Sequence, residues 1–303
     1  MLIRLRTGLA AVMAAVLVLP ALCSCIRDDR GDCEFPLRLH FTYLYNREAT
    51  DLLRAEVSSL HLALYHTDGG RLAAQTSLAV ADLDADNNLE WLVPEGRYTL
   101  VAWGGLGNHY VVSSPHSLSS TQVSHADGAV VSRHDEHLWH RAITDVTVTG
   151  NLTSTLEVDL HKLSNDLTVS VVIDDSGLSS DAAVTAANAT YTSLGTIHPD
   201  APTTTYRPRS ESGTHHFTLG TLAPDDDSIL RLTLAPASRS ADDAVSEIFN
   251  GSLSALLAAD PDVDLDLDDD FRLEFRVNTT GSNAAVSAYV NGWHIVDYDV
   301  TLR

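Results

Sequence analysis

Leu37–Tyr43, which reads LRLHFTY, alternates apolar and polar side chains over seven positions. Because successive side chains of a β-strand point to opposite faces, this alternation predicts a strand with one buried face. Similar short runs, bounded by turn residues, recur along most of the chain. The sequence therefore predicts an all-β protein.

Two blocks of such runs are separated near Leu163. Asp68–Gly70 predicts a hairpin turn, and Pro94–Gly96 predicts a second turn. Asp51–Ser59 and Ile248–Ala259 have helical character, and a His- and Ser-rich stretch after Asn108 is expected to be loop. Besides 37–43, the expected strands are 60–65, 89–93, 98–103, 145–148, 155–161, 167–173, 187–191, 216–219, 229–234, 271–277, 284–290 and 293–302. We expect two tandem β-sandwich domains, residues 35–162 and 163–303.

Composition limits the classes of partner. The chain has 303 residues with 41 acidic and 19 basic side chains, a net charge of −22, and Lys162 is its only lysine. Its 44% of hydrophobic residues can form a core. An acidic chain without a basic run is repelled by phosphate, which argues against nucleic-acid binding and against electrostatic docking to anionic lipid.

The N-terminus offers another route to a membrane. Arg4 and Arg6 precede an apolar segment, Gly8–Leu22, of the length a signal peptide requires. The residues up to Cys25 resemble the lipobox of bacterial lipoproteins, which implies cleavage after Ser24 and lipidation of Cys25. An ordinary signal peptide is the alternative. Lipid chains anchor a protein without help from its charge.

The expected N-terminal layout is a signal peptide at 1–24 and a lipidated tether at 25–34. Of three cysteines, Cys23 leaves with the signal and Cys25 carries lipid, so Cys33 has no partner for an intrachain disulfide. The fold must therefore depend on its core. The short acidic tether also resembles surface-export tethers of Bacteroidetes lipoproteins, although a simple solvated linker explains it equally well.

Several segments in a fixed order carry a family resemblance. They are Cys33–Pro36, Asn46–Leu60, Pro94–Tyr98, Val101–Gly104 and Val290–Trp293. Together with the lipobox, they make the mature chain similar to the FimB/Mfa2 family of fimbrial anchor subunits from Bacteroidetes. The resemblance implies two transthyretin-like Greek-key domains. It also implies an outer-membrane lipoprotein that tethers a type V fimbria and limits its length, with the major stalk fimbrillin as partner.

The resemblance also suggests how the fibre ends. Subunits of this class join by strand complementation, in which main-chain hydrogen bonds hold a strand from one subunit in its neighbour. Stalk subunits open their groove when a protease removes an N-terminal strand. If Leu37–Tyr43 is that strand, its retention beside the lipidated Cys25 would keep the groove filled and make this subunit a chain terminus.

The last strand is the candidate contact with that partner. The segment consists of Tyr298, Asp299, Val300, Thr301 and Leu302, which alternate polar and apolar side chains. It is either donated to the first stalk subunit or the closing strand of its own domain. The second interpretation is favoured because Trp293 looks like a core residue.

Three groups of polar residues were weighed as metal sites. His125, His134, His137 and His140 lie within sixteen residues, but their spacing matches no established ligand set. Asp84, Asp86, Asn88 and Glu95 match a calcium loop, except that Leu89 replaces its glycine and an extended 89–93 would carry Glu95 away. The acidic run Asp260–Asp270 is expected to be an exposed edge strand with protective charges, and otherwise a calcium site. We predict no metal and no cofactor.

Catalysis is not expected, because the sequence has no nucleophile elbow, phosphate-binding glycine loop or His-Glu-x-x-His motif. No small-molecule substrate is predicted. Two other classes remain open: an accessory or tip adhesin of the same fimbriae, and a carbohydrate-binding surface lipoprotein. The latter needs an exposed aromatic side chain, and Trp139 in the His-rich stretch is its candidate.

Overall fold

The computed structural model describes residues 33–132, 135, 137–150, 154–224, 226–238 and 245–302. The predicted signal peptide, its cleavage position at Ser24 and the lipidation candidate Cys25 lie outside the described residues. In the part that is described, no helix has the length and apolar character needed to cross a bilayer.

Seven strands form the sheet of the first half, in the order β3-β2-β5-β9-β10-β1-β4. They are β1 (Glu34–Tyr45), β2 (Ser59–His66), β3 (Leu72–Ala79), β4 (Asn88–Pro94), β5 (Gly96–Gly104), β9 (Trp139–Val148) and β10 (Thr155–Lys162). β9 and β10 share only two residue pairs, so the sheet divides there into two layers. The short helix α2 (Leu53–Glu56) precedes β2, as the helical character of 51–59 predicted.

β1 shows how the alternating pattern forms the core between these layers. Leu39 and Phe41 are fully buried, and both pack with Leu62 of β2 and Leu100 of β5 in one apolar cluster. β1 itself pairs in parallel with β10 and antiparallel with β4. The predicted strand at 37–43 is confirmed, and it lies inside the sheet.

A small third sheet covers the outer face of β2 and β5. Its strands are β6 (Tyr110–Ser113), β7 (Gln122–His125) and β13 (Thr190–Thr192). Trp103 and Trp139 are each only 2% exposed. The prediction that the His- and Ser-rich stretch is loop was therefore wrong, because its apolar residues cover a sheet face. Trp139 was also wrongly placed in a loop, since it begins β9.

The second half is a sandwich of two sheets around one core. The first sheet has the order β15-β16-β11-β19-β20-β21 and the second the order β18-β17-β12-β14-β8. The strands are β8 (Val130–Val131), β11 (Ser164–Ile173), β12 (Leu178–Ala186), β14 (Thr204–Tyr206), β15 (Arg209–Glu211), β16 (Thr214–Gly220), β17 (Ile229–Pro236), β18 (Ser246–Ser252), β19 (Asp270–Thr280), β20 (Asn283–Val290) and β21 (Trp293–Thr301). The all-β fold class is thereby confirmed.

Three local predictions in this half were wrong. The strand expected at 187–191 is displaced, because Leu178–Ala186 forms β12 and only Thr190–Thr192 forms β13. Ile248–Ala259 is not one helix, since β18 runs to Ser252 and only α3 (Leu253–Leu257) is helical. The acidic run 260–270 is not an edge strand: it forms turns up to the start of β19.

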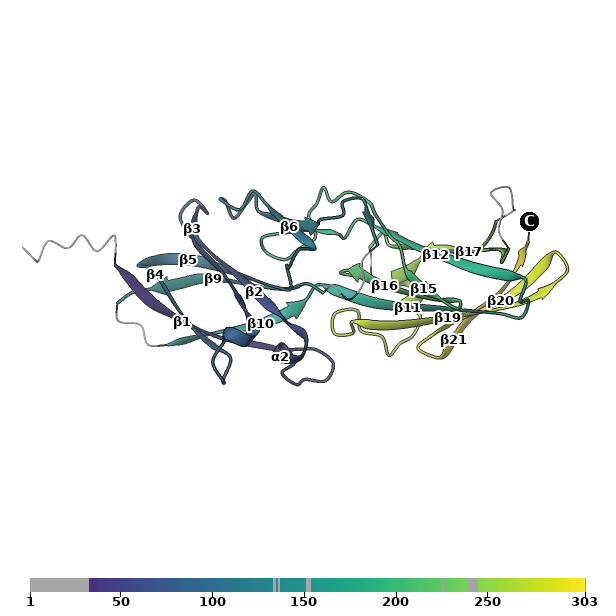
Figure 1. Cartoon of the computed structure of the whole chain (residues 1–303), viewed down its shortest axis with the longest axis horizontal. Coiled ribbons are helices and arrows are strands. Elements are labelled where there is room, and N and C mark those ends of the chain that lie inside the picture. The colour runs from purple at the N-terminus through teal and green to yellow at the C-terminus, as the bar shows by residue number, and fades with distance from the viewer. Residues whose placement is uncertain are drawn as a thin grey trace, which may run out of the picture.

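The two halves are joined closely and lie end to end (Figure 1). Leu163 alone separates β10 from β11. Its N–H donates to the Leu138 carbonyl at 2.7 Å, and its carbonyl accepts from the Tyr191 hydroxyl at 2.8 Å. In addition, β8 pairs with β14 of the second half, and β13 pairs with β7 of the first. The predicted domain boundary between residues 162 and 163 stays a prediction.

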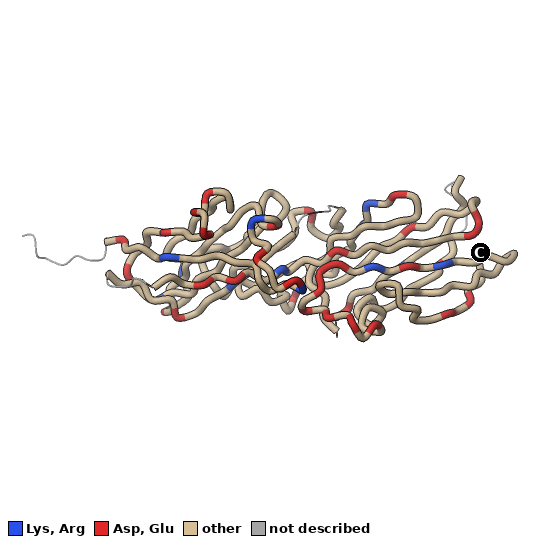
Figure 2. Tube along the Cα trace, turned by 90° about the horizontal axis from the view of Figure 1, so that it is seen from below, with Lys and Arg blue, Asp and Glu red and all other residues tan. Residues whose placement is uncertain are grey.

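The long axis separates the ends of the described chain. β1 begins at one tip and the C-terminus lies at the other (Figure 1). Acidic residues are spread along both halves, and basic ones are few (Figure 2). A contact at the C-terminal tip therefore lies at the opposite end of the described chain from the start of β1.

Candidate functional site

β21 is the outermost strand of its sheet. It pairs antiparallel with β20 on one side, and no described strand pairs with its other side. The Leu302 N–H donates to the Ser282 carbonyl at 2.7 Å, so residue 302 faces β20. Because alternate residues of a strand point their backbone groups to the same side, Val300 also faces β20, whereas Asp299 and Thr301 face outward. This edge offers free main-chain donors and acceptors.

Side chains of β21 nevertheless belong to its own sandwich. Ile295, Tyr298, Val300 and Leu302 pack against the core of the second half. The Tyr298 hydroxyl donates to the Ile248 carbonyl of β18 at 2.7 Å, and burial raises the pKa of Tyr298 to about 12. The structure thus pairs the candidate partner strand internally while leaving its outer edge open.

The first residue of β21 differs from expectation. Trp293 was predicted to be a core residue, but it is 59% exposed, the largest exposed fraction among the described large apolar side chains. It follows the two-residue turn Asn291-Gly292, in which both residues have positive φ angles. Trp293 pairs with the fully buried Val290 across this turn, yet its own side chain stays exposed.

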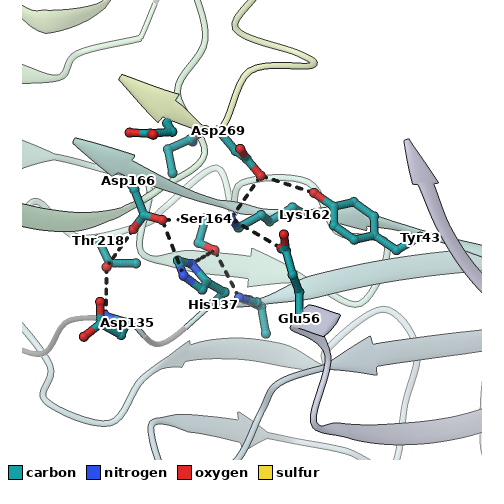
Figure 3. Close-up of polar contacts among 12 residues, drawn as sticks. Tyr43, Glu56, Asp135, His137, Lys162, Ser164, Asp166, Thr218 and Asp269 are labelled. Atoms are coloured by element: carbon teal, nitrogen blue, oxygen red, sulfur yellow. Dashed lines mark hydrogen bonds and ion pairs between the residues drawn. The ribbon is translucent and has the colours of Figure 1, made fainter. Parts of the chain in front are cut away.

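A polar cluster occupies the junction between the halves (Figure 3). Lys162, with only 9% of its side chain exposed, lies 3.0 Å from Asp269, 3.9 Å from Glu56 and 4.0 Å from Asp166. The Tyr43 hydroxyl donates to Asp269 at 3.2 Å. The lysine therefore ties α2 and β10 of the first half to β11 and the segment before β19, and Tyr43 adds β1 through Asp269.

The carboxylates of this cluster outnumber its single ammonium. Burial raises the pKa values of Glu56 and Asp166, and Lys162 opposes that shift in both. On the far side, the His137 Nδ1 lies 3.2 Å from the Ser164 hydroxyl, and burial with the nearby lysine lowers the pKa of His137 to about 4. A neutral His137 and a charged Lys162 thus both face Asp166.

The acidic run lies beside this cluster. The Asp260 and Asp264 side chains accept from backbone N–H groups two residues later, at Asp262 and Asp266, each at 3.0 Å. Such side-chain caps favour turns over strands, which is why the predicted edge strand does not form. Asp268 forms an ion pair with Arg47 of the first half.

Two of the candidate metal ligands, His140 and Asp84, bond to protein groups instead. His140 Nε2 lies 2.9 Å from the Ser193 carbonyl, and its pKa is lowered to about 4 by burial. Asp84 accepts from the backbone N–H groups of Asp86 and Asn88, capping its own turn. His134 lies outside the described residues. Within the described ranges, no group of three or more His, Cys, Asp or Glu side chains is arranged to hold a metal.

Sequence reasoning missed the junction cluster. One signal was available, because the only lysine of an acidic chain stands directly before Leu163. A buried lysine in an acidic chain is an expected point of charge pairing. Asp166 is only four residues away, but Glu56 and Asp269 are each more than 100 residues from Lys162 in the sequence, which no local pattern reveals.

The chain was compared with protein families, curated protein sequences and solved structures. The family model for "Fimbrillin-A associated anchor proteins Mfa1 and Mfa2" matches residues 30–299. A comparison with curated protein sequences finds no match. Among solved structures, the fimbrial anchor protein Mfa2 from Porphyromonas gingivalis is similar, with a TM-score of 0.67 and 20% identity over 88% of this chain and 100% of that one.

A second similar structure comes from Bacteroides thetaiotaomicron and is described among "putative polysaccharide binding proteins". Its TM-score is 0.70, with 19% identity over 86% of this chain and 97% of that one. At such identities the likeness of the structures shows a shared fold.

Proposed function

The chain belongs to the family of fimbrillin-A associated anchor proteins Mfa1 and Mfa2, and on that basis we propose that it anchors a type V fimbria to the outer membrane. In this proposal it is a surface lipoprotein, lipidated at Cys25 after cleavage behind Ser24. It contacts the stalk fimbrillin through a strand and ends the fibre. Its role is structural, without catalysis.

Attachment to the membrane is supported by the short stretch of sequence between Cys25 and the first strand. β1 begins at Glu34, nine residues after the lipidation candidate. Nine extended residues span about 30 Å at most, so the first sandwich would be held close to the membrane. The family resemblance and the lipobox are the basis for this end.

Termination is supported by the place of β1 within its sheet. Leu37, Leu39, Phe41 and Tyr43 are all buried between the two layers. At about 1.5–3 kcal/mol for each buried side chain, removing β1 would cost about 6–12 kcal/mol, comparable to the stability of a whole domain. A retained β1 therefore fills the groove that a stalk subunit would open, which favours an anchor over a tip subunit.

One observation carries the proposal: the C-terminal end of β21, whose outer edge no described strand covers, and the start of β1 lie at opposite tips of the molecule (Figure 1). A lipid at one tip leaves the other tip directed away from the membrane. There a strand of the stalk fimbrillin can add to β21 by main-chain hydrogen bonds. The hydrogen bonds of Leu163 and the ion pairs of Lys162 at the junction would transmit tension between the two ends.

The test uses proline at outward-facing and inward-facing positions of β21. Asp299→Pro and Thr301→Pro remove N–H groups that face the free edge, which an edge strand tolerates. Both variants should fold normally, yet capture of purified stalk fimbrillin should weaken at least about tenfold. Val300→Pro is the matched control, because it removes an N–H that faces β20 and should lower the melting temperature.

Unchanged capture by a folded Asp299→Pro, Thr301→Pro double variant would overturn the proposed contact. Loss of capture together with loss of folding in that variant would count against the assignment of outward-facing groups. Donation of the strand, the alternative left open by the sequence, predicts instead that Tyr298 leaves Ile248 when the partner binds.

The carbohydrate-binding alternative loses the residue on which it depended. Trp139 is 2% exposed and contacts Tyr43 edge-on, with ring centroids 6.1 Å apart. It offers no surface for a sugar ring. We therefore do not propose a glycan site in the His-rich stretch.

A further inference from the structure

Trp293 is an exposed aromatic side chain that follows an anchored turn. The turn is attached to β19, because the Asn291 N–H donates to the Arg272 carbonyl at 2.8 Å and the Asn291 side chain accepts from the Arg272 N–H at 3.2 Å. A tryptophan side chain has only two rotatable bonds, so it loses little conformational entropy when it binds. Its 59% exposure is not explained by packing within the chain.

Trp293 lines an open groove of about 660 Å³ at the junction end of the six-stranded sheet. Its lining includes Thr168 and Ser170 of β11, Glu274 of β19 and the acidic run around Asp262. Hydroxyl, carboxylate and amide groups therefore surround the single large ring. A volume of this size suits a small organic ligand.

The charges in the groove are largely paired or negative. Arg272 lies 3.3 Å from Asp270, and Arg47 is paired with Asp268, so both guanidinium groups are already neutralised. Five carboxylates line the groove against these two arginines, and one of the five, Glu274, is paired through one oxygen with Arg276 of the same strand. An anionic ligand would be repelled, and a fully apolar one would leave the polar groups without partners.

We propose that this groove binds a neutral glycan. One sugar ring would stack its C–H face on the Trp293 ring, and its hydroxyls would donate to the carboxylates of Asp262 and Glu274. Aromatic rings contribute a large apolar contact area, and hydrogen bonds to charged acceptors are stronger than neutral ones. The anchor would thus touch a neutral polysaccharide near the cell surface.

This site is separate from the proposed fimbrial contact. Trp293 begins β21 and shares its groove with Arg47 of the first half, whereas β21 ends near the C-terminus at the distal tip (Figure 1). None of the outward-facing residues at that tip lines the groove. The two proposals can therefore fail independently.

The test measures binding of the complete mature protein to soluble hexasaccharides by calorimetry. The neutral probes are cellohexaose, mannohexaose and chitohexaose, and the acidic probe is hexagalacturonate. We expect at least one neutral probe to bind and hexagalacturonate not to bind. Trp293→Ala should weaken binding at least about tenfold, and Trp293→Phe should retain part of it.

Leu92→Ala is the matched control, because Leu92 is 55% exposed on β4 in the other half. It should bind like the wild type. Asp299→Pro should also leave glycan binding unchanged. The proposal is overturned if no neutral probe binds, if Trp293→Ala binds as tightly as the wild type while folded, or if hexagalacturonate binds more tightly than the neutral probes.

Discussion

Replacing Lys162 with methionine tests the junction between the two halves. Lys162→Met keeps the apolar stem but removes the only ammonium within 4.0 Å of Glu56, Asp166 and Asp269. Removing one partner of a buried ion pair costs about 3–5 kcal/mol. Because these carboxylates are 34–37% exposed, water screens part of the repulsion. We expect a loss of about 2–3 kcal/mol at pH 8.

The loss should shrink in acid. Burial raises the pKa values of Glu56 and Asp166 in the folded state. Their contribution to the free energy of unfolding is therefore complete only when the pH lies below the ordinary carboxyl pKa values, where both groups are protonated. This contribution is lost as the pH rises through the raised pKa values. Lys162 lowers both pKa values, and its removal raises them further. Near pH 4.5 protonation relieves the repulsion, and the loss should fall below about 1 kcal/mol.

Urea unfolding followed by tryptophan fluorescence measures this loss, because Trp139 contacts Tyr43 beside the cluster. Arg97→Met is the control: its ion pair with Asp145 has both side chains about two-thirds exposed, at 66% and 68%. It should change stability by less than about 0.5 kcal/mol at either pH. Equal losses for Lys162→Met at pH 8 and pH 4.5 would refute the reasoning.

Three further predictions concern the core, a buried histidine and the lipid. Phe41→Ala should cost about 3–5 kcal/mol in thermal unfolding, because Phe41 is fully buried, while exposed Arg38→Ala should change little. His140 should stay neutral down to about pH 4 by NMR, and the stability it confers should fall as the pH drops from about 6.5 to about 4; titration near 6.5 would contradict its burial. Cys25→Ala should abolish labelling with radioactive palmitate, and persistent labelling would exclude lipidation at this residue.

Strands with one exposed face were predictable because their alternation is strong, as in β1 and β19. β12 was missed because its buried residues include Ala182 and Ala186, whose small side chains give a weak hydrophobic signal. Phe249, Leu253 and Leu257 are spaced as in a helix only because a strand and a helical turn meet at the same core.

The candidate sites were less predictable than the fold. The burial of Trp293 depends on how the residues after the turn pack against the core. The apolar character of a residue does not specify this packing. The acidic run alternates like a strand, yet the Asp260 carboxylate caps its own backbone and overrides that pattern. The cluster around Lys162 joins distant segments, so it exists only once both halves are folded.

Amide exchange at the end of β21 tests the central claim most directly. The account predicts that, when the stalk fimbrillin is added, the N–H groups of Asp299 and Thr301 gain protection by NMR. Those of Val300 and Leu302, which face β20, should stay protected throughout. Unchanged exchange at Asp299 and Thr301 in a complex that has formed would contradict the claim that the fimbria docks on this edge.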